Sequence, residues 1–232
     1  MCFPMSRSRY NMAIEIVTIN PKKPSLQTIR RAARLIVKGK VIVCPTDTGY
    51  AFAANSLNTK AVAGVFELKG RAYANPIHVA VDSLETAGKY AYLNEAAERL
   101  AHNFLPGALT LVLPKKEIVP HLLVAGGETI GIRIPDNRVI LELAAMINLP
   151  LTATSANISG QPTPYSAHEI LSQAREAMAP VALVLDQGPL LVRELSTIVD
   201  LTASPPQLLR QGRVSWLEIR QVLQPLHDLA SE

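Results

Sequence analysis

Residues 65–81 constrain the fold of this chain most, because a helix, a turn and a strand follow one another there as VFELKGRAYANPIHVAV. Val62 and Phe66 lie one turn apart on the apolar face of the helix, which Thr59 can cap. Gly70 supplies the left-handed residue that ends it. The segment therefore predicts a buried helix that stops at a short turn.

This turn carries two cations and leads into an apolar strand. Lys69 and Arg71 flank the helix end, Asn75-Pro76 imposes an extended backbone, and the run 77–81 reads as a buried strand interrupted by His78. Two fixed cations beside a strand end suit a phosphate-bearing ligand. Cations are also favoured at any helix C-terminus, because they complement the negative end of the helix dipole. The pair alone leaves both interpretations open.

The composition predicts one globular domain with a large core. The chain has 232 residues, of which 48% are hydrophobic, and this suffices for one large domain or two small ones. Because no linker divides the chain, we expect a single domain at 15–222. A flexible tail at 1–14 should precede it, and a second tail at 223–232 should follow it. The apolar runs are too interrupted to span a membrane, and the N-terminus lacks a signal-peptide run. A cytoplasmic protein with no membrane partner is therefore expected.

The cysteine and histidine content and the net charge limit which kinds of binding site are expected. The two cysteines argue against a disulfide framework, and the five histidines lack metal-ligand spacing, so we expect no protein-bound metal. The net charge is +4. This mild basic excess permits contact with nucleotides or nucleic acid without requiring it.

Predicted helices and strands alternate along the chain. Helices are expected to begin at Ser25, Thr59, Ser83, Asn94, Asn137, Ser166 (through Ala177) and Ser215. Strands are expected at 41–44, 51–54, 77–81, 108–113, 130–134, 151–153, 181–186, 197–201 and 207–210. Because several strands follow one another closely near the end, the pattern predicts an α/β fold with a sheet of mixed parallel and antiparallel direction and flanking helices.

Two polar turns follow predicted strands. Residues 45–50 read PTDTGY, and residues 154–160 read TSANISG directly after the strand at 151–153. In α/β proteins, ligands bind at the carboxyl ends of strands, so the second turn is a candidate site. The alternatives are an ordinary polar turn for the first segment and a helix cap or Asx turn for the second.

Arg133 interrupts the apolar strand IGIRI. It is either the outward residue of a half-covered strand or an inward charge with a partner. The strand pattern alone favours the outward position.

Several common chemistries are excluded. The chain has no G-x-x-x-x-G-K-[ST] loop, no dinucleotide fingerprint and no G-x-S-x-G elbow. The candidate functional groups that remain are hydroxyls, an amide and cations at the ends of predicted strands.

Together, these segments resemble the YrdC-like family over about residues 26–219, in order and in spacing. The resemblance rests on PTDTGYAF (45–52), FELKGRAYANPIHV (66–79), PGALTLVLP (106–114), IGIRIPDN (130–137), TSANISG (154–160), ELSTIVDL (194–201) and LLRQGRVS (208–215). It implies a twisted mixed α/β fold with a basic concave groove. It also implies threonylcarbamoyl-AMP synthase activity, in which L-threonine, bicarbonate or CO2, and ATP give threonylcarbamoyl-AMP and pyrophosphate.

The resemblance also implies roles for individual residues. Lys69 and Arg71 would be catalytic. The residues that would bind ATP are Lys69, Arg71, Ser155, Asn157 and Arg210. Those that would line the threonine or carbamate pocket are Thr46, Tyr50, His78, Thr110, Arg133 and Ser196. Arg133 thus changes from a surface charge to a partner of a carboxylate or phosphate, which its planar fork suits. Mg²⁺ would accompany ATP rather than occupy a protein site.

The implied product feeds N6-threonylcarbamoylation of adenosine 37 in tRNA, with other proteins performing the transfer. Direct contact with tRNA is compatible with this. The alternative from another class is a non-catalytic member that binds tRNA or double-stranded RNA through its phosphates.

Three positions depart from the family pattern: Asp47 replaces a usual Glu, Gly49 replaces a larger residue, and Ala72 replaces a frequent Pro. A paralogous branch of the same family shares some of these sequence motifs but lacks the full Lys-x-Arg and Ser-x-Asn sets.

Overall fold

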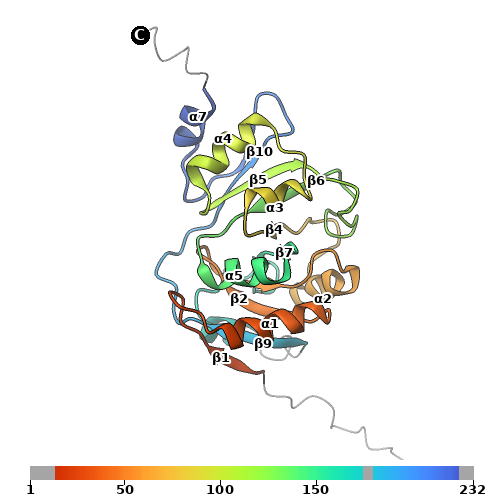
Figure 1. Cartoon of the computed structure of the whole chain (residues 1–232), viewed down its shortest axis with the longest axis vertical. Coiled ribbons are helices and arrows are strands. Elements are labelled where there is room, and N and C mark those ends of the chain that lie inside the picture. The colour runs from red at the N-terminus through yellow and green to blue at the C-terminus, as the bar shows by residue number, and fades with distance from the viewer. Residues whose placement is uncertain (1–13, 175–179, 225–232) are drawn as a thin grey trace, which may run out of the picture.

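The computed structural model describes residues 14–174 and 180–224, which form two mixed sheets with helices packed around them (Figure 1). The tails predicted at 1–14 and 223–232 lie largely outside these ranges, as does the end of the helix predicted to reach Ala177. Ile14, at the first described position, packs against the core.

Short strands build both sheets. The five-stranded sheet has the order β1-β9-β2-β3-β8, and the six-stranded sheet has the order β11-β10-β5-β6-β4-β7. The strands are β1 Ile16–Thr18, β2 Val41–Pro45, β3 Tyr50–Ala53, β4 Val79–Ala80, β5 Leu109–Pro114, β6 Thr129–Arg133, β7 Leu151–Thr152, β8 Thr154–Ser155, β9 Val181–Asp186, β10 Thr197–Asp200 and β11 Gln207–Arg210. Both sheets contain parallel and antiparallel pairs, which confirms the predicted mixed direction. The sequence pattern suggested a single sheet, and the structure has two.

The helices flank these sheets. They are α1 Leu26–Val37, α2 Thr59–Lys69, α3 Leu84–Gly88, α4 Glu95–Phe104, α5 Arg138–Ile147, α6 Ala167–Ala174 and α7 Trp216–Leu223. In Figure 1, α1 and α5 lie in front of the lower, five-stranded sheet, and α3 and α4 lie by the upper one. Among the described residues, none of the helices has the length and apolar character needed to cross a bilayer.

Strand β2 of the five-stranded sheet is apolar on both faces. Along β2, Ile42 and Cys44 face a core that includes Ile29 of α1 and Leu143 of α5, whereas Val43 faces the larger core that α2 and the second sheet share. Successive residues of a strand point to opposite faces, so both must be apolar when both are covered. This double coverage explains the continuous apolar run that marked the strand in the sequence.

Capping residues set most helix starts as predicted. The side chains of Ser25, Asn94, Asn137 and Ser215 each accept a hydrogen bond from a backbone N–H in the first turn, and Ser215 forms a reciprocal capping box with Glu218. The cap predicted at Thr59 was wrong by one position. Asn58 accepts from the N–H groups of residues 60 and 61, and Thr59 is the first helical residue.

Three strands differ from the predictions by more than a shift of one residue. The strand predicted at 77–81 is regular only over Val79–Ala80. β1 was missed because three residues with only partial burial give little periodic signal. β8 was taken for a polar turn, because Thr154 and Ser155 are hydrophilic although their backbones pair with Phe52 and Ala51 of β3.

Candidate functional site

A cavity of about 170 Å³ lies between the two sheets, at the ends of several strands. The β2–β3 turn and the segment 153–155 form the wall that belongs to the five-stranded sheet. The wall from the six-stranded sheet and its connections presents polar and cationic side chains, namely His78, Thr110, Arg133, Ser196 and Arg210.

The structure brings the predicted site residues together. Those that line the cavity are Thr46, Tyr50, Arg71, His78, Thr110, Arg133, Ser155, Ser196 and Arg210. The other two, Lys69 and Asn157, lie next to it, where they contact Ser155 and each other. Segments separated by more than a hundred residues thus converge on one space.

Lys69 is buried, although the sequence placed it at an open turn. It is the last residue of α2, which Gly70 ends at φ 55°, and it is 2% exposed. Its Nζ donates to the carbonyl oxygen of Ser155 at 2.6 Å, to that of Asn157 at 3.2 Å and to Asn157 Oδ1 at 2.7 Å. Burial, aided by the nearby Arg71 charge, lowers the pKa of Lys69 to about 7. The three oxygens that meet its three donors stabilise the charged form.

Arg71 reaches the cavity from the turn after α2. Its Nη2 donates to the carbonyl oxygen of Pro76 at 3.1 Å, and its buried Nε has no partner among the described residues. Burial lowers the pKa of Arg71. A buried donor without a partner carries a free-energy cost that an acceptor on a ligand would remove.

The β2–β3 turn presents hydroxyls at the cavity. Thr46 Oγ1 donates to the carbonyl oxygen of Gly49 at 2.7 Å and accepts from the N–H of Thr48 at 3.1 Å. Gly49 has φ 140°, and a Cβ there would lie 2.5 Å from Cγ2 of Thr163. A larger residue would therefore clash with the facing chain, and this accounts for glycine at one of the positions that depart from the family pattern.

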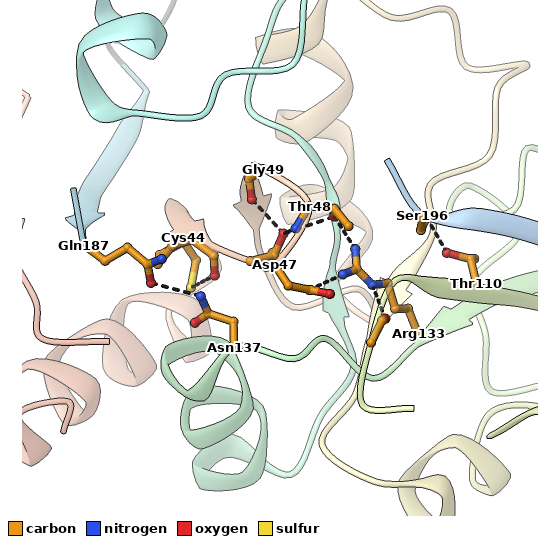
Figure 2. A network of polar contacts seen from close by, with 12 residues as sticks. Cys44, Asp47, Thr48, Gly49, Thr110, Arg133, Asn137, Gln187 and Ser196 are labelled. Carbon is orange, nitrogen blue, oxygen red and sulfur yellow. Dashed lines mark hydrogen bonds and ion pairs between the residues drawn. The ribbon is translucent and has the colours of Figure 1, made fainter. Parts of the chain in front are cut away.

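Arg133 points inward, so the outward position that the strand pattern favoured was wrong. The residue is 7% exposed. Its Nε donates to the carbonyl oxygen of Gly107 at 3.1 Å, Nη1 donates to Thr48 Oγ1, and Nη2 forms an ion pair with Asp47 Oδ1 (Figure 2). Burial lowers the pKa of Arg133, and the Asp47 carboxylate acts in the opposite direction. The partner comes from the other sheet, so local sequence gave no sign of it.

A hydroxyl pair and Arg210 line the cavity from β5, the segment before β10 and the end of β11. Thr110 Oγ1 and Ser196 Oγ lie 2.9 Å apart (Figure 2). Arg210 donates from Nε and Nη2 to the Ser196 carbonyl oxygen, at 3.0 and 2.8 Å, and from Nη2 to Ser196 Oγ at 3.0 Å. These bonds hold the guanidinium of β11 against the segment that leads into β10.

His78 and Tyr50 both line the cavity, and their surroundings shift the pKa of each. Burial first, and then the positive charges of Arg210, Arg71 and Arg133, lower the pKa of His78 to about 4, so it is neutral at pH 7. The Tyr50 hydroxyl donates toward Asp186 Oδ1 at 3.0 Å and the Gly188 carbonyl oxygen at 2.8 Å, and it accepts from the N–H of Gln187 at 3.1 Å. Burial and the Asp186 charge raise the pKa of Tyr50.

The cavity therefore suits an anion with several hydrogen-bonding groups. Its walls carry three arginines, neutral hydroxyls and a neutral histidine. Within 14–174 and 180–224, no three His, Cys, Asp or Glu side chains gather as metal ligands would. Sequence reasoning missed Thr48, Thr163 and Leu195 as lining residues. Thr48 belongs to the PTDTGY turn and Leu195 to the ELSTIVDL segment, so both could have been found there, whereas Thr163 has no distinguishing pattern.

Comparisons with known proteins identify similar chains. The family model for Sua5, YciO and YrdC, described as "Telomere recombination", matches residues 34–212. The chain is 42% identical over 198 residues to a threonylcarbamoyl-AMP synthase of Pyrococcus abyssi, covering 84% of this chain and 57% of that protein. It is 37% identical to a putative threonylcarbamoyl-AMP synthase of Methanocaldococcus jannaschii, covering 87% of this chain and 93% of that one.

A solved structure supports the same relationship. The crystal structure of P. abyssi Sua5 complexed with L-threonine matches with a TM-score of 0.85 and 38% identity, covering 90% of this chain and 60% of that chain. This chain thus spans less than two thirds of the P. abyssi protein and nearly the whole of the M. jannaschii relative.

Proposed function

This chain belongs to the Sua5–YciO–YrdC family, and from that premise we propose that it is a threonylcarbamoyl-AMP synthase. The reaction condenses L-threonine, bicarbonate or CO2, and ATP to threonylcarbamoyl-AMP and pyrophosphate. The observation that carries the proposal is the convergence of Arg71, Arg133 and Arg210 on one cavity that hydroxyls also line. Relatives of 37–42% identity bear the same activity in their names, and the solved relative was crystallised with L-threonine.

The chemistry requires charge neutralisation more than covalent catalysis. The threonine amine captures CO2 as a carbamate, and a carbamate oxygen then attacks the α-phosphorus of ATP while pyrophosphate leaves. The carbamate and the triphosphate are both anions, so they must be held together against their repulsion. Fixed cations in a site with restricted access to water supply this stabilisation and the alignment.

The proposed roles follow the positions in the cavity. Arg71 and Arg210 bind the phosphates of ATP, and Ser155 and Asn157 bind neighbouring atoms of the nucleotide. Lys69 already has three acceptors, so it meets a phosphate oxygen only by exchanging one of them. Lys69 and Arg71 together neutralise the charge that develops in the transition state. Threonine and its carbamate take the remaining pocket residues, namely Thr46, Tyr50, His78, Thr110, Arg133 and Ser196.

Magnesium belongs to the substrate in this proposal. A cavity wall of arginines and neutral oxygens does not fit a resident divalent cation, which prefers carboxylate ligands. Mg²⁺ is proposed to enter with the phosphates of ATP, and no step depends on a protein-bound metal. The product would pass to separate transferase proteins that modify tRNA in the cytoplasm, with or without direct contact between tRNA and this chain.

One assay tests the function. Purified protein is mixed with ATP, Mg²⁺, bicarbonate and L-threonine, and the adenylate is detected by mass spectrometry while pyrophosphate is followed in parallel. We expect a product that requires all three substrates and is lost when L-threonine is omitted. Arg210→Ala should greatly reduce it, and Arg34→Ala, at an exposed position of α1, serves as the matched control. Binding of tRNA or double-stranded RNA without adenylate would instead support the non-catalytic alternative.

A further inference from the structure

An ion pair joins the two sheets beside the cavity. Asp47 comes from the β2–β3 turn of the five-stranded sheet, and Arg133 is the last residue of β6 in the six-stranded sheet. Their side chains are 9% and 8% exposed. Figure 2 shows the carboxylate of Asp47 and the hydroxyl of Thr48 meeting the guanidinium of Arg133 from the same side.

Asp47 and Arg133 face different spaces. Arg133 lines the cavity described above, whereas Asp47 lines a separate cleft of about 380 Å³ that Gly107 and Asp136 also border. Asp47 Oδ2 is buried without a hydrogen-bond partner among the described residues. The carboxylate is thus outside the substrate cavity and touches it only through Arg133.

The bonds of Arg133 determine which donors remain for a ligand. A guanidinium has five N–H donors in a rigid fork. Gly107, Thr48 and Asp47 take one each from Nε, Nη1 and Nη2. One donor is left on each terminal nitrogen, so Arg133 still has two N–H groups that can donate to the oxygens of a carboxylate or carbamate.

We propose that Asp47 is a positioning residue that holds the Arg133 fork across the sheet boundary, so that the two remaining donors face the carboxylate or carbamate of the amino-acid substrate. The inference rests on the proposed function for the identity of that substrate, but not for the placement of Arg133. Without Asp47, Arg133 would be a buried charge without a counter-ion, which is strongly destabilising, so in this proposal the guanidinium moves toward solvent. The substrate would then lose these two donors.

The first experiment measures the position of Arg133 without any substrate. In ¹⁵N-labelled protein, the Nε–H signal of Arg133 is identified by its absence in Arg133→Lys, and its exchange with solvent is measured. Asp47→Asn should accelerate this exchange at least tenfold, and Asp47→Glu should keep it within threefold of the wild-type rate. Asp136→Asn makes the same chemical change beside the same cleft, without a bond to Arg133, and should leave the rate unchanged. Unchanged exchange in Asp47→Asn overturns the proposal.

The second experiment measures the consequence for the reaction. Asp47→Asn should raise the KM for L-threonine at least tenfold while kcat stays within threefold, and Asp47→Glu should restore the wild-type KM. In an Arg133→Gln background, Asp47→Asn should have no further effect on KM, because the carboxylate acts only through Arg133. A further tenfold rise in that background overturns the proposal. The double variant also removes both buried charges, so it remains usable if Asp47→Asn alone does not fold.

The two experiments separate the two claims. If the wild-type protein makes no adenylate, the proposed function fails, and the exchange measurement still decides the role of Asp47. If adenylate forms but the exchange rate of Arg133 does not respond to Asp47→Asn, the function stands and the positioning role fails.

Discussion

The Nζ of Lys69 lies 2.7 Å from Oδ1 of Asn157 and thereby ties the end of α2 to the polar turn that follows β8. The same oxygen accepts a hydrogen bond from Ser155 Oγ at 2.7 Å, and Asn157 Nδ2 donates to the carbonyl oxygen of Gln161. Lys69 is therefore part of the framework that orders this turn, in addition to being a cation near the cavity.

This contact predicts that the two cations of the Lys-x-Arg pair differ in their effect on stability. Lys69→Met keeps the aliphatic length but removes three hydrogen bonds and leaves the Asn157 carbonyl oxygen without a donor among the described residues, so the free energy of unfolding should fall by about 1–3 kcal/mol. Arg71→Ala removes one hydrogen bond at a half-buried turn, so its loss should stay under about 1 kcal/mol. Urea unfolding measures both. Equal losses for the two variants would contradict this distinction, whereas both variants should lose synthase activity.

The histidine in the cavity predicts a dependence of stability on pH. The pKa of His78 is lowered from 6.5 to about 4 in the folded protein. Between these values the unfolded chain binds a proton that the folded protein does not, so the free energy of unfolding should fall as pH drops from 6.5 toward 4. His78→Asn should flatten this part of the curve and leave the slope above pH 7 unchanged. An NMR titration in which His78 becomes protonated above pH 6 would contradict the prediction.

The backbone beside that histidine predicts a steric effect. A Cβ at Gly131 would lie 2.4 Å from Cδ2 of His78 and 2.9 Å from its Cγ. Gly131→Ala should therefore displace the ring, lower the free energy of unfolding by about 1–3 kcal/mol and reduce adenylate formation. Gly64→Ala is the matched control, because its Cβ would meet only Val41 Cγ2, at 3.7 Å, in the middle of α2. Gly64→Ala should raise the free energy of unfolding by about 0.5–1 kcal/mol. Thermal unfolding distinguishes the two outcomes.

The Tyr50 hydroxyl predicts a link between the β2–β3 turn and the segment after β9. Tyr50→Phe leaves the Gln187 N–H without its acceptor and removes the bonds to Asp186 and Gly188. We expect a loss of about 1–2 kcal/mol in the free energy of unfolding and faster amide exchange at residues 187 and 188. If amide exchange there matched the wild-type protein, the hydroxyl would not be what holds this segment.

Local features of the fold could be predicted from the sequence, because the interactions that cause them are local. Ser25, Asn94, Asn137 and Ser215 cap helices as expected, since a cap bonds only to residues within the next turn. Gly70 adopts the left-handed conformation that the helix end requires. The division into two sheets could not be predicted in this way, since it depends on which strands pair across long stretches of chain.

The same distinction between local and long-range interactions applies to the candidate site. The types of residue at the strand ends, and their resemblance to a known family, indicated which side chains would gather. The orientation of Arg133 could not be inferred from its own strand, because the Asp47 carboxylate that compensates its charge lies 86 positions away and in the other sheet. The burial of Lys69 could not be inferred for the same reason, since its acceptors lie in β8 and just after it.

The placement of the cavity between the sheets has a mechanical consequence. A molecule bound there contacts side chains from both sheets and their connections, so it acts as a temporary crosslink between the two sheets. Each substrate that enters should raise the melting temperature in proportion to the logarithm of its concentration once the site is saturated. Under the proposed function, release of the adenylate requires the contacts that bridge the two sheets through it to break.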